Sequence, residues 1–372
     1  MATISLCMIV KNEERVLKRC LDSIYDLVDE IVIVDTGSTD STKSIARKYT
    51  DKIYDFEWID DFSAARNYSF SKCTMDYIYV ADADEYLDDN NRLQFKILKD
   101  NIYPEIEIVQ MMYETISNDT VLNVYREYRP KLYKRMRSFT WINPVHETVR
   151  LDPLVFDSDI VVTHAPEGNH ASRDFGIFEG EIERKGVLSD ELIKMYALEL
   201  YKNGTVSDFE KASRFFNPLT DFSSLINSDG DKVISTKDYY GIFITAKYYR
   251  LKGHESFETY ALSAIEFLES DTSEICFELG EYYLDKALYE KAAEFFNRAY
   301  TSESCIDIHT GGDYPLRRLI NSCEIVLDKY ENFKSENGCD DEMESLISEY
   351  RELLNKYRIE LDNWKMPEEI QY

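Results

Sequence analysis

The first hundred residues alternate between two patterns of apolar positions. Four short apolar runs are typical of strands buried on both faces of a sheet: residues 4–10, 31–34, 53–56 and 77–81. Between them, apolar residues recur every three or four positions, which predicts helices that begin near Asn12, Ser41 and Ser63. Strands that alternate with helices predict a mostly parallel, doubly wound α/β sheet, whose ligands bind beyond the carboxyl ends of the strands.

The pattern changes after Glu105. Three strand-like segments follow one another closely, IEIVQMM, VLNVYREY and KLYKRM. This succession predicts an antiparallel extension of the sheet, up to about Val162. From about Arg173 onward helical spacing takes over, so we expect an α/β domain over residues 1–175 and an all-α domain over residues 176–372.

The all-α part contains a helical repeat. Residues 276–300 carry small and aromatic residues at the spacings of a tetratricopeptide repeat: Leu279, Gly280, Tyr283, Ala292, Phe296 and Ala299. Weaker copies lie at 208–216 and 248–268, a closing amphipathic helix is predicted over 346–357, and an exposed loop is predicted over 335–344. Stacked repeats would present a surface for a peptide or for a second copy of the chain, or would only steady the α/β domain.

Composition limits the class of partner. The 372 residues are 44% apolar and carry a formal net charge of −28. That charge repels nucleic acid and anionic lipid and favours a cationic partner such as a basic peptide, although it also serves solubility alone. No apolar run is long enough for a membrane span, and the N-terminus reads as a strand rather than a signal peptide. Seven scattered cysteines without a CxxC pair favour a reducing cytoplasm over a disulfide framework or a zinc site.

Three carboxylates end the fourth strand, in the segment YIYVADADEYL. Asp82 and Asp84 lie two positions apart, so an extended backbone turns both side chains to one side. Their repulsion is costly unless a cation lies beside them, and Mg²⁺ or Mn²⁺ suits oxygen ligands. Mg²⁺ held by one or two carboxylates completes its shell with water and phosphate oxygens, so a metal here implies a phosphate-bearing substrate. The alternative is a solvated acidic turn.

Four motifs occur in order: ISLCMIVKNEE, IVIVDTGSTDST, DFSAARN and YVADADEYL. Together they strongly resemble the family 2 glycosyltransferases, which have the GT-A fold, over roughly the first 165 residues. The longer signature VDTGSTDST…FEWIDDFSAARN, followed by a helical repeat, resembles a branch that includes the peptide glycosyltransferases of glycosylated bacteriocins. Dinucleotide-binding and P-loop sites have little support, because neither glycine-rich motif occurs.

The resemblance implies a UDP-sugar site. Asp35 matches an acidic residue near the base and ribose, and Val10, Lys11 and Glu13 are expected to line the same nucleotide pocket. Arg66 matches an arginine that approaches the diphosphate, and its planar donor fork suits phosphate oxygens. Taken alone, Asp35 could instead cap the following helix, and Arg66 could pair with a neighbouring acid.

The resemblance also implies a metal site. Asp84 is expected to bind Mg²⁺ or Mn²⁺ directly, and Asp82 to contact the ribose or the metal. His164, at the end of a strand-like run in VVTHAPEGNH, is expected to complete the metal shell.

The segment WINPVHETV resembles the His-Glu segment of this branch. An inverting transfer needs a base that deprotonates the acceptor, and Glu147 is the first choice for it. His146 could orient the acceptor, serve as the base, or be a core histidine at a strand end.

These features support one main hypothesis and two alternatives. The main one is a cytoplasmic, metal-dependent, inverting transferase that moves a sugar from a UDP-sugar, most simply UDP-glucose, to a Cys or Ser side chain of a peptide such as a bacteriocin precursor. The partners would be the UDP-sugar, that peptide and a second copy bound through the helical domain. One alternative is an enzyme that glycosylates a lipid or a cell-surface glycan. The other is a non-catalytic helical-repeat scaffold, against which the Asp82/Asp84 pair and Glu147 speak.

Overall fold

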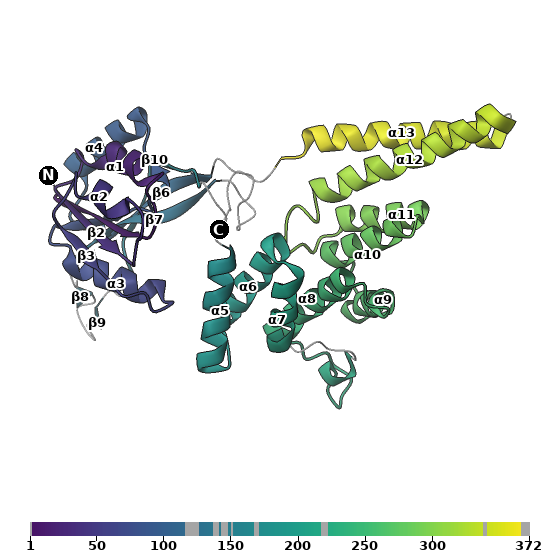
Figure 1. Ribbon diagram of the computed structural model, residues 1–372, viewed down its shortest axis with the longest axis horizontal. Helices are drawn as coiled ribbons and strands as arrows, with labels where there is room; N and C mark the ends of the chain where they lie inside the picture. Colours follow the sequence, from purple (N-terminus) through teal and green to yellow (C-terminus); the bar gives the residue numbers. More distant parts are fainter. Residues whose placement is uncertain are drawn as a thin grey trace. The chain divides into compact units, whose positions relative to one another are not determined.

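The computed structural model describes residues 2–115, 126–136, 141–142, 148–149, 152–166, 171–216, 222–337 and 341–365. The chain divides at residues 169 and 170 into two compact units (Figure 1). The first is an α/β unit, drawn in purple to blue, and the second is a helical unit, drawn in teal to yellow.

The α/β unit is built on an eight-stranded sheet of order β3-β2-β1-β4-β7-β6-β10-β5. Its strands are β1 (Ile4–Val10), β2 (Glu30–Asp35), β3 (Ile53–Asp55), β4 (Tyr77–Val80), β5 (Glu85–Tyr86), β6 (Ile108–Thr115), β7 (Arg126–Lys134) and β10 (Val155–His164). The first four are parallel, β7 is antiparallel to both its neighbours, and β10 is parallel to β6 and antiparallel to β5. A separate pair consists of β8 (Trp141–Ile142) and β9 (Thr148–Val149). The predicted parallel sheet with an antiparallel extension is confirmed.

Helices cover both faces of this sheet, which explains the unbroken apolar runs of its central strands. Four helices belong to the unit: α1 (Leu17–Ile24), α2 (Thr42–Ala46), α3 (Phe62–Lys72) and α4 (Asp89–Asn101). The even-numbered residues of β1 share one buried cluster with Leu21 of α1 and Phe95 of α4. Cys7, which points the other way, lies in a second cluster with Phe70 of α3.

Two local expectations were wrong. Asn12 does not cap a helix, since α1 begins only at Leu17, and Asn12 has a left-handed φ of 56°. Its side-chain oxygen instead accepts a hydrogen bond from the amide of Thr39 at 2.8 Å and joins the loops after β1 and β2. The segments VLNVYREY and KLYKRM are not separate strands. The single strand β7 runs from the end of the first segment into the second and stops at Lys134, and residues 121–125 lie outside the described part.

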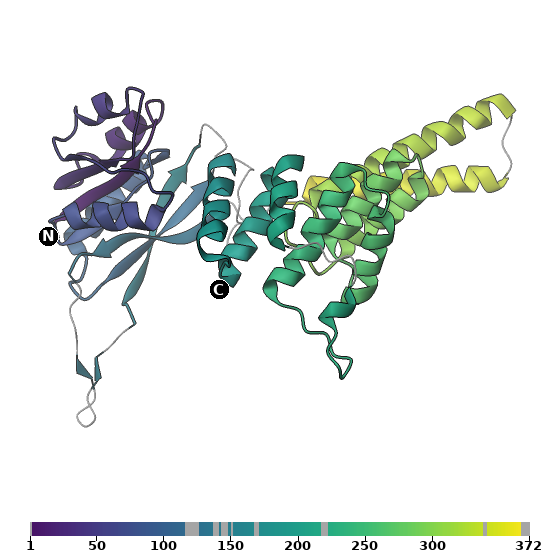
Figure 2. The same ribbon diagram turned by 60° about the horizontal axis from the view of Figure 1, so that its bottom comes forward.

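The helical unit contains a 3₁₀ turn (Phe222–Leu225) and nine α-helices among the described residues: α5 (Ala171–Lys185), α6 (Asp190–Asn203), α7 (Val206–Phe216), α8 (Thr236–Lys252), α9 (Phe257–Leu268), α10 (Ser273–Asp285), α11 (Tyr289–Thr301), α12 (Asp313–Asn337) and α13 (Asp341–Asn363). Sequence neighbours pack on one another from α10 to α13, and α12 and α13 run side by side (Figure 2). The predicted repeat 276–300 falls on α10 and α11. The predicted loop 335–344 is wrong at both ends, because α12 extends to Asn337 and α13 begins at Asp341.

Two absences hold within the described ranges. No helix there combines the length and the apolarity needed to cross a bilayer. The six cysteines described there carry free thiols.

Gly280 allows α10 and α11 to approach closely. A Cβ atom on Gly280 would lie 2.5 Å from two ring carbons of Phe296, whereas a Cβ on Gly180 in α5 meets nothing within 4 Å. We therefore expect Gly280→Ala to destabilise the helical unit by about 1–3 kcal/mol through overpacking. Gly180→Ala, the matched control, should stabilise it by about 0.5–1 kcal/mol through helix propensity. Urea denaturation measures both, and equal effects would contradict this packing.

Glu30 is a buried carboxylate held by donors from three separate segments of the chain. Its side chain is 1% exposed and pairs with Lys52. It accepts hydrogen bonds from the Ser5 hydroxyl and from the amide and hydroxyl of Thr74, the latter two at 2.7 and 2.9 Å. Burial alone would raise the pKa of Glu30, but these donors outweigh burial and lower the pKa from 4.5 to about 2.

This depressed pKa gives a pH-dependent contribution to stability. Because the folded value lies below the ordinary one, the contribution is complete above about pH 4.5 and is lost as the pH falls toward 2. We expect wild type to exceed Glu30→Gln in free energy of unfolding at pH 6 and to lose much of that advantage at pH 2.5. Glu57→Gln, at an exposed position, should show no such change. An advantage over Glu30→Gln that is independent of pH would contradict the assignment.

Candidate functional site

The predicted donor-site residues lie at one edge of the sheet. β2 and β4 flank β1 and run parallel to it, so their carboxyl ends meet at the same edge, about 10 Å apart. Asp35 is the last residue of β2, and Asp82 and Asp84 follow the end of β4. The topology therefore places these three carboxylates where an α/β sheet binds its ligands.

The side chain of Asp35 is buried, and only one of its two carboxylate oxygens has hydrogen-bond partners among the described residues. Its Oδ2 accepts hydrogen bonds from the amides of Gly37 and Ser38 at 3.1 and 3.0 Å and lies 3.4 Å from Nζ of Lys43. Its Oδ1 is buried and has no hydrogen-bond partner among the described residues. Asp35 does not cap α2, whose N-cap is Ser41. A buried acceptor without a partner costs about 1–3 kcal/mol, so Oδ1 is placed to receive a donor from a ligand.

The loop after β1 is tied to the loop after β2. The carbonyl of Val10 accepts hydrogen bonds from the amide and the hydroxyl of Thr36 at 3.0 and 3.3 Å, and the Val10 side chain is buried in the core. The amide of Glu13 donates to the Thr42 hydroxyl at 2.7 Å, and Lys11 is exposed. Val10 thus contributes to this edge through its backbone carbonyl, whereas Lys11 and Glu13 belong to the loop that follows β1 at the edge.

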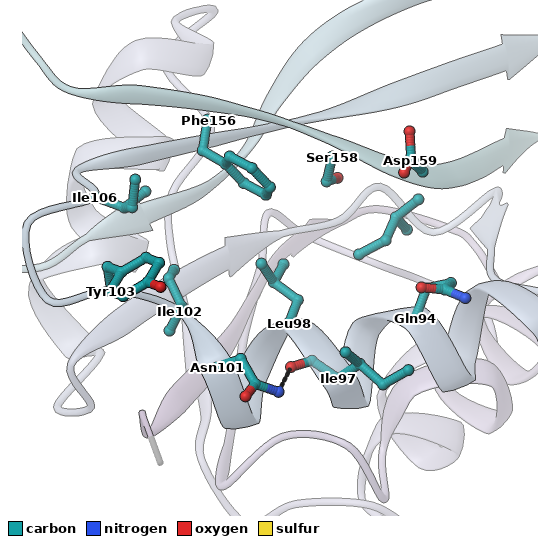
Figure 3. A pocket seen from close by; sticks show the side chains of 11 residues that line it. Gln94, Ile97, Leu98, Asn101, Ile102, Tyr103, Ile106, Phe156, Ser158 and Asp159 are labelled. Carbon is teal, nitrogen blue, oxygen red and sulfur yellow. Dashed lines mark hydrogen bonds between the residues drawn. The ribbon is translucent and has the colours of Figure 1, made fainter.

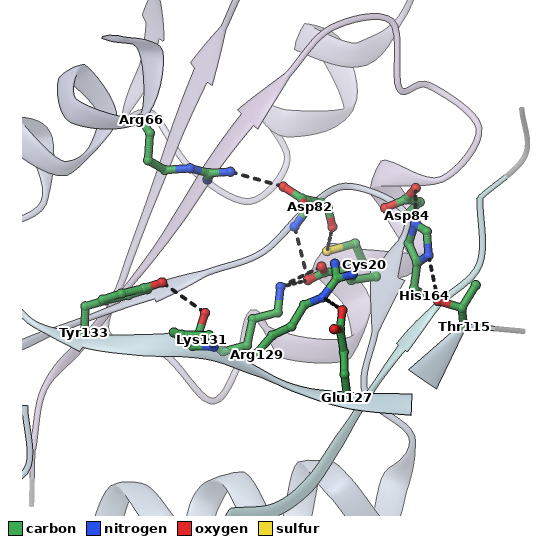
Figure 4. A network of polar contacts seen from close by, with 12 residues as sticks. Cys20, Arg66, Asp82, Asp84, Thr115, Glu127, Arg129, Lys131, Tyr133 and His164 are labelled. Atoms are coloured by element: carbon green, nitrogen blue, oxygen red, sulfur yellow. Dashed lines mark hydrogen bonds and ion pairs between the residues drawn. The ribbon is translucent and has the colours of Figure 1, made fainter. Parts of the chain in front are cut away.

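Arg66 reaches the carboxylate turn from α3 (Figure 4). Asp61 caps this helix by accepting from the Ala64 amide at 3.1 Å, which fixes Arg66 on the second turn. Nη2 of Arg66 lies 3.3 Å from Oδ1 of Asp82, while Nη1 is buried without a hydrogen-bond partner among the described residues. Desolvation raises the pKa of Asp82, but the charges of Lys131 and Arg66 outweigh it and hold the pKa below its ordinary value. The acid that pairs with Arg66 is therefore a member of the site.

The side chains of Asp84 and His164 lie within hydrogen-bond distance of each other. Nε2 of His164 lies 3.1 Å from Oδ2 of Asp84, and Nδ1 lies 3.4 Å from the Thr115 hydroxyl (Figure 4). The ring of Tyr113 stacks on the imidazole, with 5.1 Å between ring centroids. Both Asp84 and His164 keep about a fifth of their side-chain surface exposed, so a ligand can reach them.

No group of three or more His, Cys, Asp or Glu side chains in the described ranges is arranged to hold a metal ion. A site for Mg²⁺ or Mn²⁺ completed by phosphate oxygens needs only one or two carboxylates. Asp84, with Asp82 in the same turn, supplies hard carboxylate oxygens of that kind, and His164 beside them offers a borderline imidazole nitrogen. The unpartnered Nη1 of Arg66 is a donor for the accompanying phosphate. The residues present therefore fit a divalent ion bound together with a diphosphate.

Sequence reasoning missed the buried partner of this turn. Lys131, from β7, places Nζ at 2.6 and 2.7 Å from the two carboxylate oxygens of Glu85. The sequence signal for a buried cation was a lysine inside the strand-like segment KLYKRM. A single sequence does not show which strands are neighbours, so the contact with Glu85 could not be predicted. Glu147 and His146, the predicted catalytic residues, lie outside the described residues.

A separate cavity of about 240 Å³ opens between α4 and β10 (Figure 3). Its lining is mainly apolar and includes Ile97, Leu98 and Phe156. None of the predicted site residues lines it, so the polar edge of the sheet remains the candidate site.

Sequence comparison agrees with the geometry of the edge. Residues 5–149 match the profile of the family described as Glycosyl transferase family 2. Over these residues, which make up less than half of its length, the chain is similar to that family. The match contains every described donor-site and metal-site residue except His164, which follows it in β10.

Curated relatives share this family 2 region. A TPR repeat-containing protein of Synechococcus elongatus is 36% identical over 161 residues, which are 40% of this chain and 36% of the relative. The SPbeta prophage-derived glycosyltransferase SunS of Bacillus subtilis is 32% identical over 164 residues, which are 42% of this chain and 36% of SunS. The chain thus matches about a third of the length of either relative.

Solved structures show weaker likeness. Glucosyl-3-phosphoglycerate synthase from Mycobacterium tuberculosis, in complex with Mn²⁺ and UDP-glucose, is 15% identical. The match covers 50% of this chain and 80% of that chain, with a TM-score of 0.34.

Proposed function

We propose that the chain is a metal-dependent, inverting glycosyltransferase that moves a sugar, most simply glucose, from a UDP-sugar to a Cys or Ser side chain of a peptide. The observation that carries the proposal is that Asp35, Arg66, Asp82 and Asp84 stand at one edge of a sheet within residues matching family 2. Two of them present buried polar atoms without protein partners in the described ranges. A nucleoside diphosphate supplies both the donor and the acceptor that these atoms lack.

Each side chain has a part in holding the donor. Asp35 would accept a hydrogen bond from the base or ribose through Oδ1. Arg66 would turn its unpartnered Nη1 to a phosphate oxygen, for which a guanidinium is well suited. Asp84, with Asp82 and His164, would hold Mg²⁺ or Mn²⁺, which supplies Lewis-acid stabilisation of the negative charge on the leaving UDP.

The transfer itself requires a base near the acceptor. A thiol or hydroxyl of the peptide approaches the anomeric carbon from the face opposite UDP and forms the new S–C or O–C bond. The C–O bond to UDP breaks, its electron pair leaves with UDP, and the acceptor proton passes to a base. We assign that base to Glu147, with His146 as the orienting residue, on the resemblance of their segment. The acidic protein would attract a basic peptide, in keeping with its net charge of −28.

Mass spectrometry tests the acceptor. The chain is incubated with UDP-glucose, Mn²⁺ and a basic peptide that contains one Cys and one Ser. Matched peptides carry Cys→Ser or Ser→Ala. The proposal expects the peptide to gain one hexose and to lose that gain when the accepting residue is replaced. UDP release without peptide modification would favour a lipid or glycan acceptor, and no UDP release with any donor would favour a scaffold.

The metal role predicts that Asp84→Asn loses activity. A bound ion contributes several kcal/mol of charge stabilisation, so we expect UDP release to fall at least about 100-fold. Asp100→Asn, at an exposed position on α4, is the matched control and should retain wild-type turnover. Unchanged turnover in Asp84→Asn would refute the metal role.

Calorimetry with UDP and with uridine can distinguish a residue that contacts the diphosphate from a residue that contacts the base or ribose. Arg66→Gln should weaken UDP binding about 10- to 100-fold, since a charged hydrogen bond contributes about 1.5–3 kcal/mol, and should leave uridine binding unchanged. Asp35→Asn should weaken UDP and uridine by the same factor, because it acts on the part that the two ligands share. If Arg66→Gln weakened both ligands equally, Arg66 would not contact the diphosphate.

A further inference from the structure

A buried ion pair lies beneath the carboxylate turn. Lys131 is 5% exposed and Glu85 is 1% exposed. Nζ of Lys131 lies within 2.7 Å of both carboxylate oxygens of Glu85. Because Lys131 is enclosed in this way, its contact with the carboxylate turn is made through Glu85.

Glu85 closes the turn that carries Asp82 and Asp84. Its Oε2 accepts a hydrogen bond from the amide of Asp82 at 3.2 Å, and its own amide donates to the carbonyl of Asp82 at 3.1 Å. These two bonds join the ends of the four-residue turn in both directions. The orientation of the Glu85 carboxylate therefore sets the backbone from which Asp82 and Asp84 project.

Neighbouring elements tie the same turn from the outside. Arg19 on α1 donates through Nη2 to the carbonyls of Asp84 and Ala165 at 3.2 and 3.0 Å. The Ala165 amide donates to the Asp84 carbonyl at 3.1 Å. These contacts hold the backbone of Asp84, whereas the Asp82 amide is held by Glu85.

Stability alone does not explain the ion pair. Burying each charge costs several kcal/mol, and apolar side chains of similar volume are often at least as stabilising. An apolar pair would fill the space, but it would leave the Asp82 amide without its acceptor. What the ion pair adds is a fixed carboxylate under the turn.

We infer that Lys131 is a positioning residue, which orients Glu85 and through it holds Asp82 and Asp84 in the arrangement that binds a divalent ion with a nucleoside diphosphate. This inference rests on the proposed function. It assigns to β7 a part in the donor site, although the side chains of Lys131 and Glu85 are almost wholly buried.

The test replaces both partners with apolar residues, so that no buried charge is left unpaired. Binding of Mn²⁺ to the full chain in the presence of UDP is followed by electron paramagnetic resonance of the free ion. Lys131→Met combined with Glu85→Leu should weaken Mn²⁺ about 10- to 100-fold, the usual effect of losing a group that orients metal ligands. Lys131→Arg should stay close to wild type, because a guanidinium binds a carboxylate with two parallel hydrogen bonds.

Lys247 and Glu278 provide a matched control. They form a similar ion pair in the helical unit, where Glu278 is 3% exposed. Lys247→Met combined with Glu278→Leu should leave Mn²⁺ affinity unchanged. Thermal unfolding of all variants shows whether each one folds.

The outcomes separate the two claims. If wild type binds neither UDP nor Mn²⁺, the proposed function fails. If wild type binds both and the Lys131/Glu85 double variant binds Mn²⁺ equally well, only the positioning role fails. If that double variant does not fold while the control does, the pair is structural and the inference is overturned.

Discussion

Repulsion among three carboxylates at the end of β4 is the constraint that organises the α/β unit. Two like charges 4 Å apart repel by about 4 kcal/mol at an effective dielectric constant of 20, so Asp82, Asp84 and Glu85 cannot stand together uncompensated. Lys131 neutralises Glu85 from below, Arg66 pairs with Asp82, and His164 lies against Asp84. The compensation is unequal, because Glu85 is enclosed whereas Asp82 and Asp84 still face the edge of the sheet.

The sheet topology makes this compensation available. Its parallel half delivers Asp35 and the carboxylate turn to one edge, and α3 brings Arg66 to the same place. Its mixed half supplies Lys131 from β7 and His164 from β10, which lie 46 and 80 residues further along the chain than the acids they contact. The antiparallel extension is therefore part of the site, since it carries Lys131 and His164, which contact Glu85 and Asp84 in the turn.

The sequence predicted the features that depend on periodicity and on strand ends. Alternating patterns located the parallel strands, and Asp35, Asp82 and Asp84 were placed because residues after parallel strands share an edge. Contacts between residues far apart in the sequence could not be predicted from it. The segment KLYKRM does not indicate that Lys131 faces Glu85, because that contact depends on β7 lying beside β4. The predicted helix cap at Asn12 was wrong for a related reason. Its side chain accepts a hydrogen bond from the amide of Thr39, in the loop after β2, and not from an amide of the helix that follows it.

The central claim is that the edge beyond β4 binds a divalent ion together with a nucleoside diphosphate. A crystal structure of the protein grown with UDP and Mn²⁺, with anomalous scattering collected to locate manganese, tests it most directly. The account predicts an anomalous peak beside Asp84, a diphosphate within hydrogen-bond distance of Arg66, and the base or ribose at Asp35. Manganese and nucleotide bound elsewhere, or an empty edge at saturating concentrations, would contradict it.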